Sequence, residues 1–256
     1  MIRRLTLALL PVAALAGCQQ PAPEGNATTN AAAAAPSPTA TVAATAPEGR
    51  DWSTVVTRTA ETGYRMGNPA APVQLVEFGS RTCPHCAAFA ASGMKPLVEN
   101  YVRTGKVSYE FRDWLRDGGD VSAALIGRCK GAEGFFPLLA AEFAYQPQIF
   151  AKEASQTKAM AAAVDKAPET EQPYVLAGQI GYLDFAKAQG ISDAEAHKCL
   201  ADIPTVEAIG KMNVRAKADY KLDGTPTFLV NGAKIDAVGW PEVEADLKAA
   251  LAKAGA

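Results

Sequence analysis

Two cysteines three positions apart, Cys83 and Cys86, are the residues of this sequence best suited to chemistry. They follow an apolar stretch, 73–78, that is typical of a buried strand, and they open a stretch with helical apolar spacing. Cys83 is therefore predicted at the first turn of a helix, where free backbone N–H groups and the positive end of the helix dipole stabilise an anion. A thiolate is such an anion, and it is the form of cysteine that attacks a disulfide.

The spacing of the two cysteines suits thiol–disulfide exchange, which needs an exposed thiolate of low pKa and a second thiol that resolves the mixed disulfide. Residues i and i+3 share a helix face, so Cys83 is predicted as the attacking thiol and Cys86 as the resolving thiol. Pro84 suits the first helical position because it lacks an N–H. His85 would place a partial or full positive charge beside the thiolate.

Two other uses of the pair are compatible with the spacing, namely a structural disulfide and half of a zinc site. Zinc would need two more ligands, and Cys129 and Cys199 are the remaining cysteines of the predicted folded part. The strand–turn–helix context favours a redox-active pair. We expect no metal site and no organic cofactor, since the disulfide is itself the redox group.

The sequence Cys83-Pro84-His85-Cys86 after a strand that ends in Glu77-Phe78 resembles the DsbA-like branch of the thioredoxin superfamily. That family often carries a buried acid six residues before the first cysteine. The resemblance therefore implies that Glu77 handles the proton of the resolving thiol. It covers about residue 52 to the C-terminus.

A second stretch, Gly-Thr-Pro-Thr at 224–227, resembles the cis-proline loop of the same family. An apolar stretch and an Asn-Gly turn follow it, and cis peptide bonds are essentially confined to proline. In the family this loop faces the cysteines and holds the substrate backbone, which implies a substrate-binding role for Thr225 and Pro226. The best-known oxidases carry valine before this proline, whereas threonine is more usual in isomerase-like relatives.

The pattern and the resemblance together predict an α/β protein, a thioredoxin fold with an inserted all-helical lobe, over residues 51–256. Strands are expected at 52–59, 73–78, 107–111, 228–230 and 234–238. The insertion covers about 119–220, where helices are expected at 121–129, 135–143, 156–164, 174–188 and 205–218, with a capping box at 192–195. A last helix is expected at 241–252. Gly93 and Pro96 are expected to kink the active-site helix.

Cys129 and Cys199 lie in separate predicted helices of the lobe. In an oxidising compartment two remaining cysteines of one domain often pair. A bridge that closes about 70 residues would stabilise the fold by about 4 kcal/mol in the chain-entropy model. Two free buried thiols and a second redox relay are the alternatives to this structural disulfide.

The first 17 residues predict a signal peptide, because Arg3 and Arg4 precede an apolar stretch, 5–15, too short for a usual membrane span,. Leu-Ala-Gly-Cys at 15–18 resembles a bacterial lipobox, which implies cleavage before Cys18 and lipidation of that cysteine. An ordinary signal peptide with an incidental cysteine is the alternative. Gln19, in place of aspartate, implies the outer rather than the inner membrane.

Residues 18–50 are rich in alanine, proline and threonine and predict a disordered tether, because they cannot bury enough apolar surface to offset chain entropy,. The formal charge of the whole chain is −2, with no basic run, so no nucleic-acid partner is expected,.

These features predict a lipid-anchored thiol–disulfide oxidoreductase of the bacterial cell envelope, with its folded domain in the periplasm. It would introduce disulfides into exported proteins that carry free thiols, and the resemblance implies a membrane redox partner that reoxidises it. A disulfide isomerase or reductase on the same fold is one alternative. A non-catalytic, thiol-dependent binding or chaperone module is another.

Overall fold

The computed structural model describes residues 46–47 and 51–256. The predicted signal peptide (1–17), the predicted lipidation site Cys18 and almost all of the predicted tether (18–50) lie outside the described residues. Within the described part, no helix is both long enough and apolar enough to cross a membrane.

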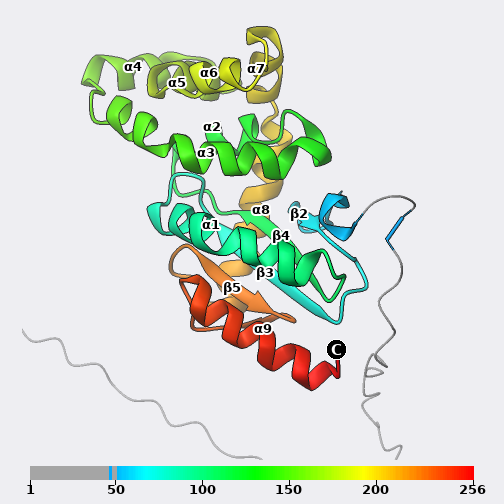
Figure 1. Ribbon diagram of the computed structural model, residues 1–256. Coiled ribbons are helices and arrows are strands. Elements are labelled where there is room, and N and C mark those ends of the chain that lie inside the picture. The colour runs from blue at the N-terminus through cyan, green and yellow to red at the C-terminus, as the bar shows by residue number, and fades with distance from the viewer. Residues whose placement is uncertain (1–45, 48–50) are drawn as a thin grey trace, which may run out of the picture. The chain divides into compact units, whose positions relative to one another are not determined.

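A mixed sheet of six strands forms the centre of the fold (Figure 1). The strands are, in chain order, β1 (Val56–Arg58), β2 (Tyr64–Met66), β3 (Val73–Gly79), β4 (Val107–Asp113), β5 (Thr227–Val230) and β6 (Ala233–Lys234). Their spatial order is β1-β2-β4-β3-β5-β6. β3 pairs in parallel with β4 and antiparallel with β5, so it is a central strand, as its continuous apolar sequence predicts,.

Helices cover both faces of this sheet. Helices α1 (Pro84–Leu97) and α9 (Trp240–Ala254) pack on one face, and α8 (Ile203–Tyr220) packs on the other (Figure 1). Successive β3 side chains alternate between the two faces. Leu75 belongs to the core under α1 and α9, whereas Phe78 belongs to the core under α8.

An all-helical lobe is inserted between β4 and α8, which confirms the predicted α/β architecture. Its helices are α2 (Gly118–Ile126), α3 (Gly131–Glu153), α4 (Lys158–Lys166), α5 (Gln172–Ile180), α6 (Tyr182–Ala188) and α7 (Asp193–Leu200). The predicted capping box is present at the start of α7, formed by Ser192 and Glu195. In Figure 1, α3 lies between the rest of the lobe and α1, and it packs against α1.

The predicted strand at 52–59 is divided in the structure. Trp52–Thr54 forms a 3₁₀ turn because the Asp51 carboxylate accepts a hydrogen bond from the Ser53 N–H (2.8 Å),. Within this range, β1 alone pairs with a neighbouring strand. β2 was not predicted; it follows a turn in which Thr62 has a φ of +61°, and a strand of three residues is too short to show a clear alternation.

Two further predicted boundaries were wrong. The helix predicted at 174–188 is interrupted by Gly181, whose φ of +96° is a left-handed conformation that glycine adopts without steric cost,. The last strand, predicted at 234–238, ends at Lys234, after which the Ile235 N–H donates to the Phe228 carbonyl (3.1 Å).

The active-site helix changes its geometry near its end. Pro96 lies inside α1 and has no N–H to donate, and residues 98–102 continue as a wider π-helical turn,. Gly93, which was expected to kink the helix, allows α1 to pack closely against Trp240 of α9. A Cβ at this position would lie 3.1 Å from Cε3 of Trp240.

Candidate active site

Cys83 and Cys86 lie where β3, the turn after it and α1 meet. Cys83 is the N-cap residue of α1, with an extended backbone (φ −87°, ψ 121°), and Pro84 is the first helical residue. The Cys83 N–H donates to the Ser80 carbonyl (3.1 Å), so the turn closes directly before the helix. The Cys83 sulfur thus lies at the helix end whose N–H groups have no acceptor within the helix. Both cysteines are free thiols in the structure.

The surroundings of Cys83 lower the pKa of its thiol from an ordinary 9.0 to about 5. A hydrogen bond from the Cys86 thiol is the largest cause, and burial opposes it. The Thr225 side chain and then the backbone N–H groups of Cys86 and His85 lower the pKa further. At neutral pH Cys83 is therefore a thiolate, the nucleophilic form.

Cys83 is much less exposed than an attacking thiol is expected to be. Only 3% of its surface is accessible, and its sulfur lies 3.2 Å from the Thr225 carbonyl oxygen. The peptide bond between Thr225 and Pro226 is cis, and these residues immediately precede β5. The loop therefore lies directly beside the Cys83 sulfur.

His85 acts on Cys83 through its backbone, as one of the first-turn N–H groups that the sequence places beside the sulfur. Its side chain is exposed, and its backbone N–H contributes to the lowered pKa of the Cys83 thiol. Every residue except proline supplies such an N–H, so this contribution depends on the position of residue 85 rather than on its imidazole. The effect of a charged ring stays a prediction.

Glu77 lies on the face of β3 that α1 covers, and its side chain is buried. Burial is the main cause that raises the pKa of this carboxyl from 4.5 to about 8, and the negative charge of Cys83 acts in the same direction. The Tyr109 hydroxyl donates a hydrogen bond to Glu77 Oε2 (2.6 Å), which opposes the shift. Within the described residues, Glu77 Oε1 has no hydrogen-bond partner. Glu77 is therefore a mostly protonated acid at neutral pH.

The resolving cysteine lies deeper than Cys83 and is completely buried. Burial raises the pKa of the Cys86 thiol, and so do its hydrogen bond to Cys83 and the charge of Glu77. The two thiols thus have opposite preferences, because Cys83 favours the thiolate and Cys86 the thiol. Glu77 and Cys86 interact directly, since the Cys86 thiol also lowers the pKa of Glu77 through a hydrogen bond.

Asp120 of α2 supports the active-site turn and was not predicted. Its Oδ1 accepts hydrogen bonds from the Ser80 hydroxyl (2.8 Å), the Thr82 hydroxyl (2.9 Å) and the Thr82 N–H (3.2 Å). Its Oδ2 accepts from the Arg116 N–H (3.0 Å) and from Arg116 Nε (3.1 Å). An aspartate in the first turn of a helix normally indicates capping, and the actual cap of α2 is Asp117,.

Arg81 is a second unpredicted residue, because a charged residue in a turn is usually exposed. It is 1% exposed, and its Nε donates to Asp113 Oδ1 (2.6 Å) while Nη1 pairs with Glu142 of α3. Arg128 binds the second oxygen of Asp113. Gly127 leaves room for the Arg81 guanidinium, which any Cβ there would strike. Both acidic partners of Arg81 are distant in sequence, so no local pattern reveals them.

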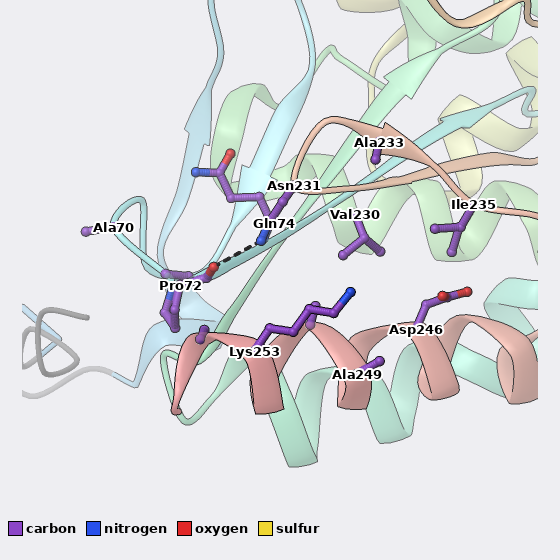
Figure 2. Close-up of a pocket in the computed structure, with 13 residues that line it drawn as sticks. Ala70, Pro72, Gln74, Val230, Asn231, Ala233, Ile235, Asp246, Ala249 and Lys253 are labelled. Atoms are coloured by element: carbon purple, nitrogen blue, oxygen red, sulfur yellow. Dashed lines mark hydrogen bonds between the residues drawn. The ribbon is translucent and has the colours of Figure 1, made fainter. Parts of the chain in front are cut away.

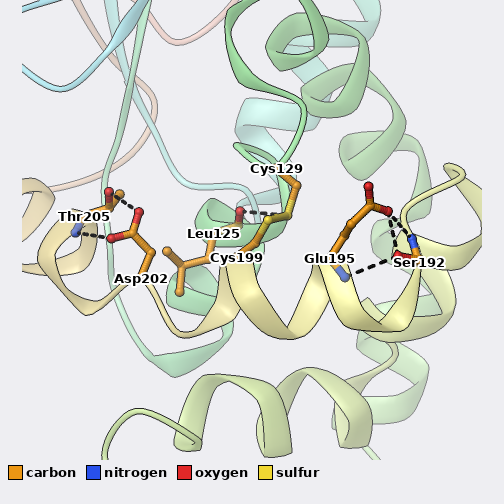
Figure 3. The surroundings of a disulfide bond; sticks show 7 residues. All are labelled: Leu125, Cys129, Ser192, Glu195, Cys199, Asp202 and Thr205. Carbon is orange, nitrogen blue, oxygen red and sulfur yellow. Dashed lines mark hydrogen bonds between the residues drawn. A yellow bond between two sulfur atoms is a disulfide. The ribbon is translucent and has the colours of Figure 1, made fainter.

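Cys129 and Cys199 form a disulfide in the lobe, with their Cα atoms 5.7 Å apart (Figure 3). Cys199 lies in α7, and Cys129 lies in the turn after α2 rather than in a helix as predicted. Because these sulfurs are bonded to each other, they cannot complete a zinc site with the Cys83–Cys86 pair. Residues 46–47 and 51–256 contain no group of three or more His, Cys, Asp or Glu side chains arranged to hold a metal.

A pocket of about 950 Å³ lies at the amino-terminal end of β3, whereas Cys83 follows the carboxyl-terminal end (Figure 2). Its lining includes Pro72, Val230 and Ile235, with Asp246 and Lys253 contributed by α9. None of the predicted site residues in the described part of the chain lines it. The candidate active site is therefore a surface beside the cysteines and the Thr225–Pro226 loop, separate from this pocket.

Comparison with known proteins gives the family. Residues 59–251 match the family model described as thioredoxin. The chain belongs to the thioredoxin family. Two relatives, in Rickettsia bellii and Rickettsia typhi, are provisionally named protein-disulfide oxidoreductases and are 30% and 32% identical over 172 residues. The match covers 67% of this chain but 58% and 55% of those relatives, so the chain spans little more than half of their length.

Solved structures agree with this assignment. The crystal structure of a protein-disulfide isomerase from Novosphingobium aromaticivorans superposes with a TM-score of 0.70 at 29% identity, covering 74% of this chain and 97% of that one. Wolbachia pipientis alpha-DsbA1 has the same fold, with a TM-score of 0.57 at 20% identity and coverage of 74% and 91%. The predicted membership in the thioredoxin superfamily is confirmed, and the fold with its inserted helical lobe is the one seen in Wolbachia pipientis alpha-DsbA1.

Proposed function

We propose that this chain is a thiol–disulfide oxidoreductase that introduces disulfides into exported proteins through the Cys83–Cys86 pair. The observation that carries the proposal is the position of the Cys83 sulfur at the start of α1, where the Cys86 thiol, the Thr225 side chain and two backbone N–H groups lower the pKa of its thiol to about 5. These contacts stabilise the reduced enzyme relative to its disulfide. A disulfide whose reduced form is stabilised is a strong oxidant.

The reaction is two successive exchanges. A substrate thiolate attacks the Cys83 sulfur of the oxidised enzyme, a mixed disulfide forms, and Cys86 leaves with the bonding electron pair. A second substrate thiolate then attacks the substrate sulfur of the mixed disulfide, and Cys83 leaves as a thiolate. Two electrons pass from the substrate to the enzyme, and the substrate gains one disulfide.

Glu77 supplies the proton that the first exchange requires. Cys86 leaves as a thiolate inside the protein, where burial disfavours its charge,. Glu77 is protonated up to about pH 8 and lies in contact with Cys86, so it can transfer its proton to that sulfur. The resulting carboxylate keeps the hydrogen bond from Tyr109.

Thr225 and Pro226 would hold the substrate. Because their loop lies against the Cys83 sulfur, an extended substrate segment there can form backbone hydrogen bonds, as a strand does when it adds to a sheet edge,. Recognition through the backbone is compatible with many sequences, as a general oxidant of exported proteins requires.

Isomerase or reductase activity is the second candidate. It is favoured by Thr225, which stands before the cis proline, and by the name of the Novosphingobium aromaticivorans structure, a protein-disulfide isomerase. In that case another donor would keep Cys83 and Cys86 reduced, and the Cys83 thiolate would attack substrate disulfides.

The cellular setting of the proposal rests on the N-terminal sequence. The lipobox-like residues 15–18 suggest lipidation of Cys18, an outer-membrane anchor and a domain in the periplasm. The residues 18–50 would give the domain reach toward exported substrates with free thiols. A membrane redox partner would reoxidise the cysteines, and no organic cofactor is needed because the electrons stay on sulfur.

The equilibrium reduction potential of the Cys83–Cys86 pair against glutathione tests the proposal, with Cys129 and Cys199 replaced by serine. A potential of about −120 mV is that of a strong oxidase, whereas about −200 mV or lower favours an isomerase or reductase. A pair that does not exchange with glutathione would contradict both activities and leave a binding module.

A further inference from the structure

Gln146 of α3 donates hydrogen bonds to the active-site turn, and it has no part in the exchange steps proposed above. Its side chain is 4% exposed, and its Nε2 donates to the Arg81 carbonyl (2.9 Å) and to the Cys83 carbonyl (3.0 Å). A glutamine amide nitrogen carries two hydrogens, and here each of them donates to one of these two carbonyl groups. One side chain of the helical lobe therefore holds the backbone on either side of Thr82.

The Cys83 carbonyl is a sensitive point at which to hold the chain. It also accepts the first hydrogen bond of α1, from the Ala87 N–H (3.1 Å). The orientation of this carbonyl therefore sets the direction in which the helix begins, and with it the N–H groups of His85 and Cys86 that act on the Cys83 sulfur. A reactive group acts more effectively when supporting hydrogen bonds hold it in the productive geometry before the reaction begins.

A second contact of α3 supports the same turn. Glu142 lies four residues before Gln146, on the same helix face, and pairs with the Arg81 guanidinium,. Helix α3 thus holds the side chain of Arg81 through Glu142 and its carbonyl through Gln146. Removing Gln146 alone leaves this ion pair, so the lobe would stay docked while the turn loses its backbone contacts.

We propose that Gln146 is a positioning residue for Cys83, and that its two hydrogen bonds hold the 81–83 turn so that the first-turn N–H groups of α1 face the Cys83 sulfur. The inference deepens the proposed function and rests on it for its biological meaning. A purely structural role, in which Gln146 only joins the lobe to the sheet, predicts lower stability with unchanged thiol chemistry.

The test replaces Gln146 by methionine, which is similar in length and has no donor. The measurements are the titration midpoint of the Cys83 thiolate, by its ultraviolet absorbance, and the equilibrium constant with glutathione. We expect a higher midpoint and an equilibrium constant about tenfold less oxidising, as lost hydrogen bonds near a charge would give. Gln148→Met is the matched control, since Gln148 is exposed on the same helix, and it should change neither quantity.

Gln146→Asn provides a graded second variant, because a side chain one methylene shorter keeps its donors but can reach at most one of the two carbonyls. An intermediate shift is expected, and this variant decides the matter if Gln146→Met does not fold. Unchanged midpoint and equilibrium constant in the folded variants would overturn the proposal, as would an equal shift in Gln148→Met. Neither measurement needs a protein substrate, so a failure of the proposed function would be recognised separately, by absent oxidation of protein thiols.

Discussion

Cys83 and Cys86 lie within one turn of α1, whereas Cys129 and Cys199 are separated by 70 residues and join two segments of the lobe. The first pair is free, and its two sulfurs have opposite pKa shifts, downward for Cys83 and upward for Cys86. The second pair is bonded, with the Cys129 sulfur near the Leu125 carbonyl (3.6 Å). The difference teaches that the low pKa of the Cys83 thiol comes from its place at a helix start, beside the Cys86 thiol and Thr225, and that a pair of cysteines elsewhere in the chain lacks these surroundings.

The same comparison extends to the two regions that carry the pairs. The sheet region supplies Glu77 and Tyr109 beside Cys86, and the loop before β5 supplies Thr225 beside Cys83. The lobe supplies Asp120 and Gln146, which hold the turn. The lobe therefore has two parts in the molecule, since it carries a crosslink of its own and also supports the reactive pair.

The largest expected difference between the pairs is in turnover. Cys83→Ser should abolish oxidation of a reduced dithiol peptide, because no other sulfur has its position at the start of α1. The combined change Cys129→Ser and Cys199→Ser should leave turnover within a fewfold of the parent. The rate of disulfide formation in the peptide measures both. A Cys83→Ser variant that keeps the biological activity of the protein without oxidising the peptide would instead favour the binding module.

The second prediction concerns stability. Removing the lobe disulfide by the same pair of serine changes should lower the unfolding free energy by about 4 kcal/mol, because a closed loop of 70 residues restricts the unfolded chain,. Urea unfolding of both proteins, with Cys83 and Cys86 oxidised in each, measures the change. An unaltered unfolding free energy would mean that the bridge has no such role.

A pH-dependent effect is expected at Glu77. The pKa of its carboxyl is about 8 in the folded protein and 4.5 ordinarily, so between these values the folded state binds more protons than the unfolded one. Stability therefore falls as pH rises, by about 1.4 kcal/mol per unit from this group. Glu77→Gln removes this loss of stability. The unfolding free energy of the variant should therefore gain about 3 kcal/mol relative to that of the parent at pH 7.

That comparison is best made on oxidised proteins, in which neither active-site cysteine titrates. Burial, the largest cause of the shifted pKa, does not depend on the redox state. Urea unfolding at several pH values gives the slope. Parallel pH profiles for Glu77→Gln and the parent would show that Glu77 has no raised pKa in the folded protein.

The smallest expected effect concerns the loop beside Cys83. Thr225→Val removes a side chain that lowers the pKa of the Cys83 thiol, so that pKa should rise. A hydrogen bond to a charge contributes about 1.5–3 kcal/mol, and the pair should become less oxidising by about 30–60 mV. Equilibration with glutathione measures the shift. A more oxidising variant would mean that the Thr225 side chain does not stabilise the Cys83 thiolate.

Local patterns were sufficient to identify the candidate motif and to predict the outline of the fold. The Cys83–Cys86 spacing, the apolar β3 segment and the helical periods of the lobe are properties of neighbouring residues, and the structure has each element in its predicted order. Boundaries were wrong where a single backbone conformation decides, as at Gly181. A left-handed glycine and a tolerated helical glycine have the same appearance in a sequence.

The amino-acid sequence by itself determined which sulfurs are the candidates for exchange, because the helix start, the proline at its first position and the second thiol lie within four residues. Only the tertiary structure decided how Cys83 is held and how far it is covered. Asp120 and Gln146 reach the turn from 38 and 65 residues away, and the 3% exposure of Cys83 depends on a loop 142 residues away. Such contacts exist only after the lobe and β5 pack against the sheet, because no local interaction brings these residues together.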